Sequence, residues 1–175
     1  MILAFYGSGK GKTTSAVGTL LRSLNLDKQV VLIQLYKNVN NMKSNELEFL
    51  KKLKLSNFTL MQFGKEKGWV NFKKPSNEDT KLTKKAVRAV STIIKKNQAD
   101  VLVIDEILLS HYYGLCSKED ILNIIQSCNE NKIDLILTGR KMRKSLLEHM
   151  DLVTEMKSIK HPFEKKIPAK EGIDF

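Results

Sequence analysis

The sequence contains few cysteines and histidines, and their spacing excludes two kinds of stabilised domain. Cys116 and Cys128 are its only cysteines, and no CxxC pair occurs. The three histidines form no cluster with metal-ligand spacing. The sequence therefore indicates neither a disulfide framework nor a zinc site, and we expect a reducing, cytoplasmic location.

Long apolar runs, repeats and linkers are also lacking. No run approaches the roughly 20 apolar residues that span a bilayer, so we expect no membrane association. The apolar N-terminus has no basic segment before it, which excludes a signal peptide. With 42% hydrophobic and 28% charged residues, the composition is that of a globular protein, and we predict one domain over residues 1–175.

Basic residues exceed acidic ones, giving a formal charge of +11. Such an excess raises the hypothesis of nucleic-acid binding. The lysines, however, are spread from Lys51 to Lys170 rather than gathered in one block. This spread favours solvated helix faces and a positive field that steers an anionic substrate. We therefore do not expect nucleic acid as the main partner, and it stays an alternative.

The strongest motif is the glycine- and lysine-rich stretch GSGKGKTT, which follows an apolar segment and precedes an amphipathic helical pattern. A strand, a glycine-rich loop and a helix in this order cradle polyphosphates with backbone N–H groups and the helix dipole. Lys12 is expected to reach the outer phosphates and Thr13 to bind Mg²⁺. The residues predicted to bind the nucleotide are Gly7, Ser8, Gly9, Lys10, Gly11, Lys12, Thr13 and Thr14.

The loop departs from the usual P-loop pattern at one position. The signature G-x-x-x-x-G-K-[ST] requires a glycine where this chain has Tyr6. Gly7 makes the loop one residue tighter, and Lys10 adds a cation. We expect the placement of the phosphates to differ from that in an ordinary kinase or ATPase.

A second motif, DVLVIDE, ends a hydrophobic segment with two carboxylates. A strand ending in Asp-Glu after a P-loop is a Walker B pattern, in which the aspartate holds Mg²⁺ directly or through water. Asp105 is the predicted metal residue. Glu106 shares the metal, polarises a reactant or has a purely structural role.

Hydrophobic segments of strand length alternate with helical patterns along the chain. The predicted strands lie at 2–6, 29–36, 57–63, 100–106, 133–138 and 152–156, and the predicted helices follow the P-loop and cover 46–55, 82–94, 117–129 and 143–150. This alternation predicts an α/β fold with a mostly parallel sheet flanked by helices. Ligands should bind at the C-terminal ends of the strands. The tail after Met156 has the composition of a disordered end.

Two further residues have alternative interpretations. Arg140 follows the predicted strand 133–138 and is either a phosphate clamp or an ordinary surface arginine. Trp69 lies in the long polar stretch from Gly64 to Asp79, where it either anchors a loop to the core or has a functional role.

Taken in order, these motifs resemble the ATP:corrinoid adenosyltransferases of the BtuR/CobO type from end to end. The matching stretches are GSGKGKTT at 7–14, VLIQLYK at 31–37, G-x-x-x-x-W at 64–69, VIDE at 103–106, ILTGR at 136–140, DLVTEM at 151–156, and the closing IKHPF and GIDF. At Lys67 the family commonly has a second aromatic residue, which Phe72 is placed to replace.

The resemblance implies a RecA-like P-loop NTPase fold and a homodimer that transfers the 5′-deoxyadenosyl group of Mg-ATP to the Co(I) atom of a reduced corrinoid, releasing triphosphate. It also implies catalytic roles for Lys12 and Trp69, the latter on the lower face of the corrin. An electron-donating flavoprotein is the implied partner. Two other classes stay open from the residues themselves, a small P-loop kinase or ATPase and a nucleic-acid-binding ATPase.

Overall fold

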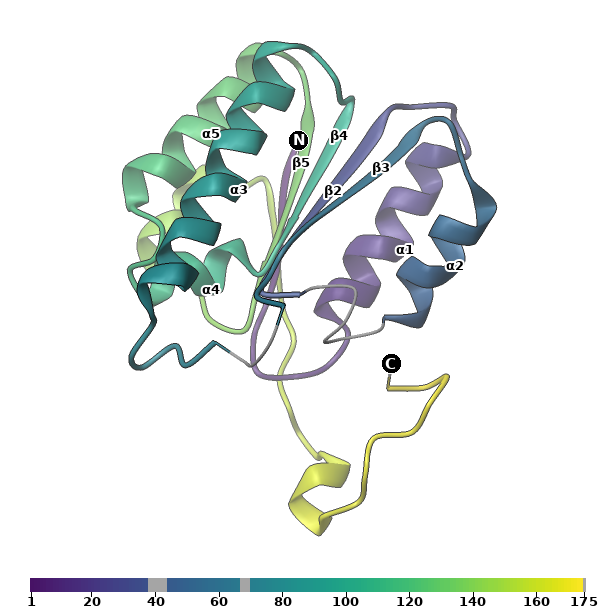
Figure 1. Ribbon diagram of the computed structural model, residues 1–175, viewed down its shortest axis with the longest axis vertical. Helices are drawn as coiled ribbons and strands as arrows, with labels where there is room; N and C mark the ends of the chain where they lie inside the picture. Colours follow the sequence, from purple (N-terminus) through teal and green to yellow (C-terminus); the bar gives the residue numbers. More distant parts are fainter. Residues whose placement is uncertain (38–43, 67–69, 175) are drawn as a thin grey trace.

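A sheet of parallel strands forms the centre of the structure (Figure 1). The computed structural model describes residues 1–37, 44–66 and 70–174, and this part of the chain contains six strands in the order β3-β2-β4-β5-β1-β6. The strands are β1 (Ile2–Tyr6), β2 (Val30–Leu35), β3 (Phe58–Phe63), β4 (Val101–Asp105), β5 (Asp134–Gly139) and β6 (Leu152–Glu155). Every neighbouring pair is parallel, which confirms the predicted sheet.

Helices cover both faces of this sheet (Figure 1). Helices α1 (Lys12–Leu24) and α2 (Asn45–Leu53) lie on one face, and α3 (Asn77–Lys95), α4 (Ile107–Tyr112) and α5 (Lys118–Glu130) lie on the other. Strand β4 illustrates why two hydrophobic cores form: Val101 and Val103 pack with α1, while Leu102 and Ile104 pack with α3 and α5. Strands buried on both faces explain the continuous apolar runs of the sequence.

Helix α3 begins earlier than predicted, and its N-terminus explains the difference. The sequence pattern predicts irregular chain up to Asp79 and a helix from Leu82 onwards, whereas the helix starts at Asn77. Ser76 Oγ accepts a hydrogen bond from Asp79 N, and the Asp79 carboxylate accepts one from Ser76 N. This capping box satisfies two N-terminal N–H groups and extends the helix towards its start.

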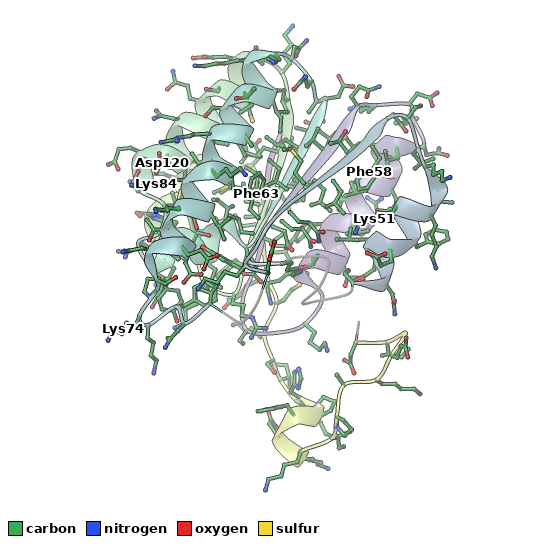
Figure 2. All side chains as sticks on the ribbon, viewed as in Figure 1. Lys51, Phe58, Phe63, Lys74, Lys84 and Asp120 are labelled. Atoms are coloured by element: carbon green, nitrogen blue, oxygen red, sulfur yellow. The ribbon has the colours of Figure 1, made fainter. Side chains whose placement is uncertain are left out.

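The basic face of α3 is exposed to solvent, as the sequence pattern predicts. Its apolar stripe, including Ala86 and Val90, is buried, whereas its lysines and its arginine are exposed. Figure 2 shows charged side chains, Lys84 among them, on the outer surface of the helix layer. The many lysines of this helix therefore form a solvated face.

The remaining segments are short. Helix α4 has only six residues, too few for a helical period to be recognised in the sequence, and it was not predicted. The segment after β5 forms a 3₁₀ helix, η1 (Lys144–His149), and the tail contains a second one, η2 (Pro162–Lys165). No helix in the described ranges is both long and apolar enough to cross a membrane.

Candidate nucleotide-binding site

The predicted phosphate-binding loop connects β1 to α1 and packs against the end of β6. Gly7 has a φ of 119°, and a Cβ atom there would lie 2.3 Å from the Met156 carbonyl oxygen, so only glycine fits without displacing that backbone. Gly9 N donates a hydrogen bond to the same oxygen over 2.7 Å. Gly11 caps α1 in a left-handed conformation. The tight loop is therefore held in place by the chain that follows β6.

Lys12 lies at the start of α1 and is buried, with 8% of its surface exposed. Its Nζ donates a hydrogen bond to Gly9 O over 2.6 Å, so the side chain folds back over the loop. Burial lowers the pKa of Lys12, and the nearby Arg140 charge acts in the same direction, while the Glu106 carboxylate opposes both. A cation in these surroundings favours an anionic ligand.

Asp105, at the C-terminal end of β4, is completely buried and accepts hydrogen bonds from four side chains. The donors are Thr13 Oγ1 (2.9 Å) and Thr138 Oγ1 (2.5 Å) to Oδ1, and Gln34 Nε2 (3.0 Å) and Lys37 Nζ (2.9 Å) to Oδ2. Burial by itself would raise the pKa of Asp105, but the Lys37 ammonium and these hydrogen bonds lower it below its usual value. Asp105 is therefore an ionised carboxylate within reach of the P-loop.

Glu106 follows directly and has a left-handed backbone conformation, with φ 65°. Its N–H donates to Thr138 Oγ1 over 2.9 Å. Its Oε2 atom is buried and has no hydrogen-bond partner in the part of the chain that the structure describes. Burial and the adjacent Asp105 charge raise the pKa of Glu106. A buried carboxyl oxygen without a donor is a position that a cation would stabilise.

The residues predicted to hold Mg²⁺ fit that ion chemically. The Thr13 hydroxyl and the Asp105 carboxylate are in direct contact, and Glu106 adds an oxygen without a donor. Mg²⁺ prefers oxygen ligands and is usually bound by one or two carboxylates together with substrate phosphates. Within the described ranges, no group of three or more His, Cys, Asp or Glu side chains could hold a metal ion.

Three residues of this cluster were not singled out from the sequence: Gln34, Lys37 and Thr138. They lie at or just beyond the C-terminal ends of β2 and β5, the two neighbours of β4. Gln34 and Thr138 are both completely buried. For Gln34 and Thr138 the available signal was a polar residue within an otherwise apolar strand, because such a residue needs a hydrogen-bond partner when it is buried.

The other predicted binding residues form an exposed rim around the loop. Ser8 Oγ accepts a hydrogen bond from Ser158 N over 3.4 Å, and Thr14 Oγ1 donates to the Glu46 carboxylate over 3.1 Å. Lys10 forms an ion pair with Asp174, near the end of the tail. The tail is almost entirely exposed, but it contains η2 and its end is attached to the loop, whereas its composition predicts a disordered end.

Arg140 is exposed, directly after β5. Its charge is close enough to Lys12 to contribute to the lowered pKa of that residue. The guanidinium is thus on the phosphate side of the sheet and accessible to a ligand. The described contacts do not distinguish the clamp from a surface arginine, and its binding role stays a prediction.

Trp69 and Lys67 lie outside the described residues. The chain that follows them is anchored by Phe72, whose ring is 4.9 Å from that of Tyr36 in an edge-to-face contact and 5.3 Å from that of Tyr113 in a stacked one. Lys141 Nζ lies 4.8 Å from the centre of the neighbouring Tyr112 ring. An aromatic and basic cluster, formed by Tyr36, Phe72, Tyr112, Tyr113 and Lys141, therefore adjoins the C-terminal edge of the sheet.

Comparisons with known proteins agree with this arrangement. A KaiC-like protein from Pyrococcus horikoshii has a similar structure, with a TM-score of 0.56 and 18% identity over 88% of this chain and 72% of that chain, a likeness that supports the RecA-like P-loop fold. Corrinoid adenosyltransferases from a Sinorhizobium species and from Escherichia coli K12 are 26% and 27% identical over all of this chain, which covers 80% and 85% of them. The family model of the ATP:corrinoid adenosyltransferases BtuR/CobO/CobP matches residues 1–175. The chain therefore belongs to the ATP:corrinoid adenosyltransferase family.

Proposed function

We propose that this protein transfers the 5′-deoxyadenosyl group of ATP to the cobalt atom of a reduced corrinoid, with the P-loop edge of the sheet as its ATP site. The observation that carries the proposal is the family match over the whole chain. In the reaction, Co(I) donates an electron pair to the ribose C5′, a Co–C bond forms and the C5′–O5′ bond breaks. The bonding electrons leave with the intact triphosphate, and no proton has to be removed.

The roles of the loop residues follow from this chemistry. The leaving group carries several negative charges, so catalysis needs cations and N–H groups that hold it in position while C5′ stays accessible. Lys12 would exchange its bond to Gly9 O for phosphate oxygens. Arg140, exposed beside it, would bind the outer part of the same group. The tight loop with its additional cation at Lys10 suits the binding of a triphosphate that leaves as a whole.

Mg²⁺ would be held by Thr13, Asp105 and Glu106. When bound, the ion neutralises charge on the triphosphate and so improves it as a leaving group. Glu106 has no need to act as a general base, because Co(I) carries no proton. Its buried oxygen without a partner suits a metal contact better than proton transfer.

The corrinoid would bind beside Trp69, the second residue to which we assign a catalytic role. An aromatic side chain on the lower face of the corrin would disfavour the axial ligand and make Co(II) easier to reduce. Phe72 is packed between Tyr36 and Tyr113, which supports a role in anchoring this segment rather than a second contact to the corrin. The aromatic and basic cluster around it adjoins the ATP edge.

We further propose that the chain is a single domain that works as a homodimer in the cytoplasm and receives electrons from a flavoprotein. Both cysteines are buried and unpaired, and burial raises the pKa of each thiol to about 12, which suits a reducing compartment. The solvated basic face of α3 adds to a positive field that would steer ATP towards the protein.

The test is an anaerobic incubation with ATP, Mg²⁺ and chemically reduced cobalamin. A light-sensitive Co–C product, observed by its absorption spectrum, is the expected result. Lys12→Ala is the matched control, because it should bind no ATP and form no product. If Co(I) is demonstrably present and no such product forms, the proposal is wrong. A small P-loop kinase or ATPase would instead release ADP.

A further inference from the structure

We propose that the Lys37 ammonium occupies the metal position before the nucleotide binds, holding Asp105 and Thr13 in place, and that Mg²⁺ takes over this position when it arrives with ATP. The inference rests on the proposed function in one respect, that Mg²⁺ and ATP are the ligands of this edge. It assigns a positioning role to a lysine outside the P-loop.

The geometry places the ammonium between the two oxygens assigned to the metal. Lys37 Nζ lies 2.9 Å from Asp105 Oδ2 and 3.4 Å from Thr13 Oγ1, while the Thr13 hydroxyl itself donates to Asp105 Oδ1 over 2.9 Å. Mg²⁺ binds oxygen at about 2.0–2.1 Å and carries twice the charge. The metal and the ammonium therefore compete for the same space and for the same negative oxygens.

The backbone before Lys37 is held in an uncommon conformation that directs the chain over the end of β4. Tyr36 has a φ of 63°, in the left-handed region that costs a non-glycine residue free energy. Its N–H donates to Phe63 O over 2.8 Å, and its hydroxyl donates to Ser110 Oγ over 2.6 Å. The first hydrogen bond holds the backbone of Tyr36 in place, and the second holds its side chain. A strained backbone conformation that neighbouring contacts maintain is typical of functional positions, and Tyr36 has such a conformation at the edge of the sheet where the ligand is expected.

Lys37 itself packs closely on the next strand end. A Cβ atom on Gly64 would lie 2.6 Å from the Lys37 carbonyl carbon, so the two backbones are in direct contact. The Lys37 side chain is only 15% exposed. The backbone of Lys37 is therefore held between the ends of β2 and β3. Its mostly buried side chain places the ammonium beside Asp105.

The balance of charge explains why the ammonium would yield to a metal. One ammonium compensates Asp105, whereas the buried Oε2 of the adjacent Glu106 has no hydrogen-bond partner among the described residues. A divalent cation at the same place would compensate both carboxylates. The displaced ammonium would remain beside Thr13, close to the bound phosphates.

The experiment measures Mn²⁺ binding to the nucleotide-free protein by electron paramagnetic resonance, with Mn²⁺ as the probe for Mg²⁺. Lys37→Met removes the charge and keeps the side-chain length, so Mn²⁺ should bind about tenfold more tightly or better than in the wild type. Lys65→Met is the matched control. Lys65 is also 15% exposed and pairs with a buried aspartate, Asp79, but not at the phosphate edge. Unchanged affinity in Lys37→Met, or an equal gain in Lys65→Met, would overturn the proposal.

A second measurement uses the wild-type chain and stays informative if Lys37→Met fails to fold. With ¹⁵N-labelled lysine side chains, the Lys37 ammonium signal should shift when Mg²⁺ and ATP are added together, and shift less with ATP and a chelator. An identical signal under both conditions would contradict the exchange. Neither measurement contains a corrinoid, so a protein that exchanges the cation but forms no Co–C bond would refute only the proposed function.

Discussion

Two buried ion pairs of this molecule are nearly identical in length and burial, but their surroundings differ. The distance from the lysine Nζ to the nearest carboxylate oxygen is 2.9 Å in the Lys37–Asp105 pair and 2.8 Å in the Lys65–Asp79 pair. Both lysine side chains are 15% exposed. Around Asp79, the further donors belong to the capping box at the start of α3. Around Asp105, donors arrive from α1, β2 and β5.

The comparison indicates that burial and pairing alone do not identify a functional site. The Asp79 pair closes a helix terminus and connects it to the preceding segment, which is a local structural role. The Asp105 pair joins strand ends that are far apart in the sequence, and donors from three different elements meet at its carboxylate. Convergence of several elements on one carboxylate is the feature that distinguishes the site, since a buried carboxyl oxygen without a hydrogen-bond partner occurs at Asp79 as well.

The largest effect should come from removing the charge of each aspartate in turn. Asp105→Asn should lower adenosyl transfer about 100-fold or more, because it removes a carboxylate that supports the metal and the charge of the leaving group. Asp79→Asn should leave the affinity for ATP close to that of the wild type. Steady-state rates and ATP binding by calorimetry measure both. Similar losses of ATP affinity in the two variants would contradict the distinction.

Asp79→Asn should act on stability instead. It weakens the capping box and replaces the charged carboxylate of the ion pair with Lys65 by a neutral amide, so the free energy of unfolding should fall by about 1–3 kcal/mol. Denaturant unfolding followed by circular dichroism measures this. A variant as stable as the wild type would show that the pair has no structural role.

Glu106→Gln should stabilise the protein while lowering its activity. In the metal-free and nucleotide-free protein, the substitution removes a buried charge beside Asp105, and we expect a gain of about 1 kcal/mol. The pKa of Glu106 is raised in the folded chain by burial and by Asp105, so ionisation opposes folding as the pH rises through that folded pKa. The gain should therefore be present at neutral pH and vanish in acid. Unfolding curves at several pH values measure it, and a gain that grows in acid would contradict this account.

The smallest effect should come from the exposed pair between the tail and the loop. Asp174→Asn removes a carboxylate that competes with phosphate for Lys10, so ATP should bind slightly more tightly, by less than about threefold. Calorimetric titration with ATP measures this. A large loss of affinity would instead show that the tail is needed to position Lys10.

Much of this site could be predicted from the sequence, because its main parts are local motifs. The P-loop is a run of adjacent residues between a strand and a helix, and Asp105 ends an apolar strand that Glu106 directly follows. The parallel sheet follows from the alternation of apolar runs and helical patterns. These patterns need no knowledge of which strands are neighbours.

The remaining parts depend on the order of the strands, which local patterns do not contain. Gln34, Lys37 and Thr138 reach Asp105 only because β2 and β5 lie on either side of β4. The early start of α3 depends on the reciprocal bonds of Ser76 and Asp79, in a stretch whose glycines and proline indicate a loop.

The measurement that tests the central claim most directly is the identity of the phosphate product. In the proposed reaction the loop binds the triphosphate as one leaving group while C5′ is attacked. ³¹P NMR of a completed anaerobic reaction with reduced cobalamin should therefore show one equivalent of intact triphosphate for each Co–C bond formed. ADP with inorganic phosphate, in amounts that match ATP consumption, would contradict the account.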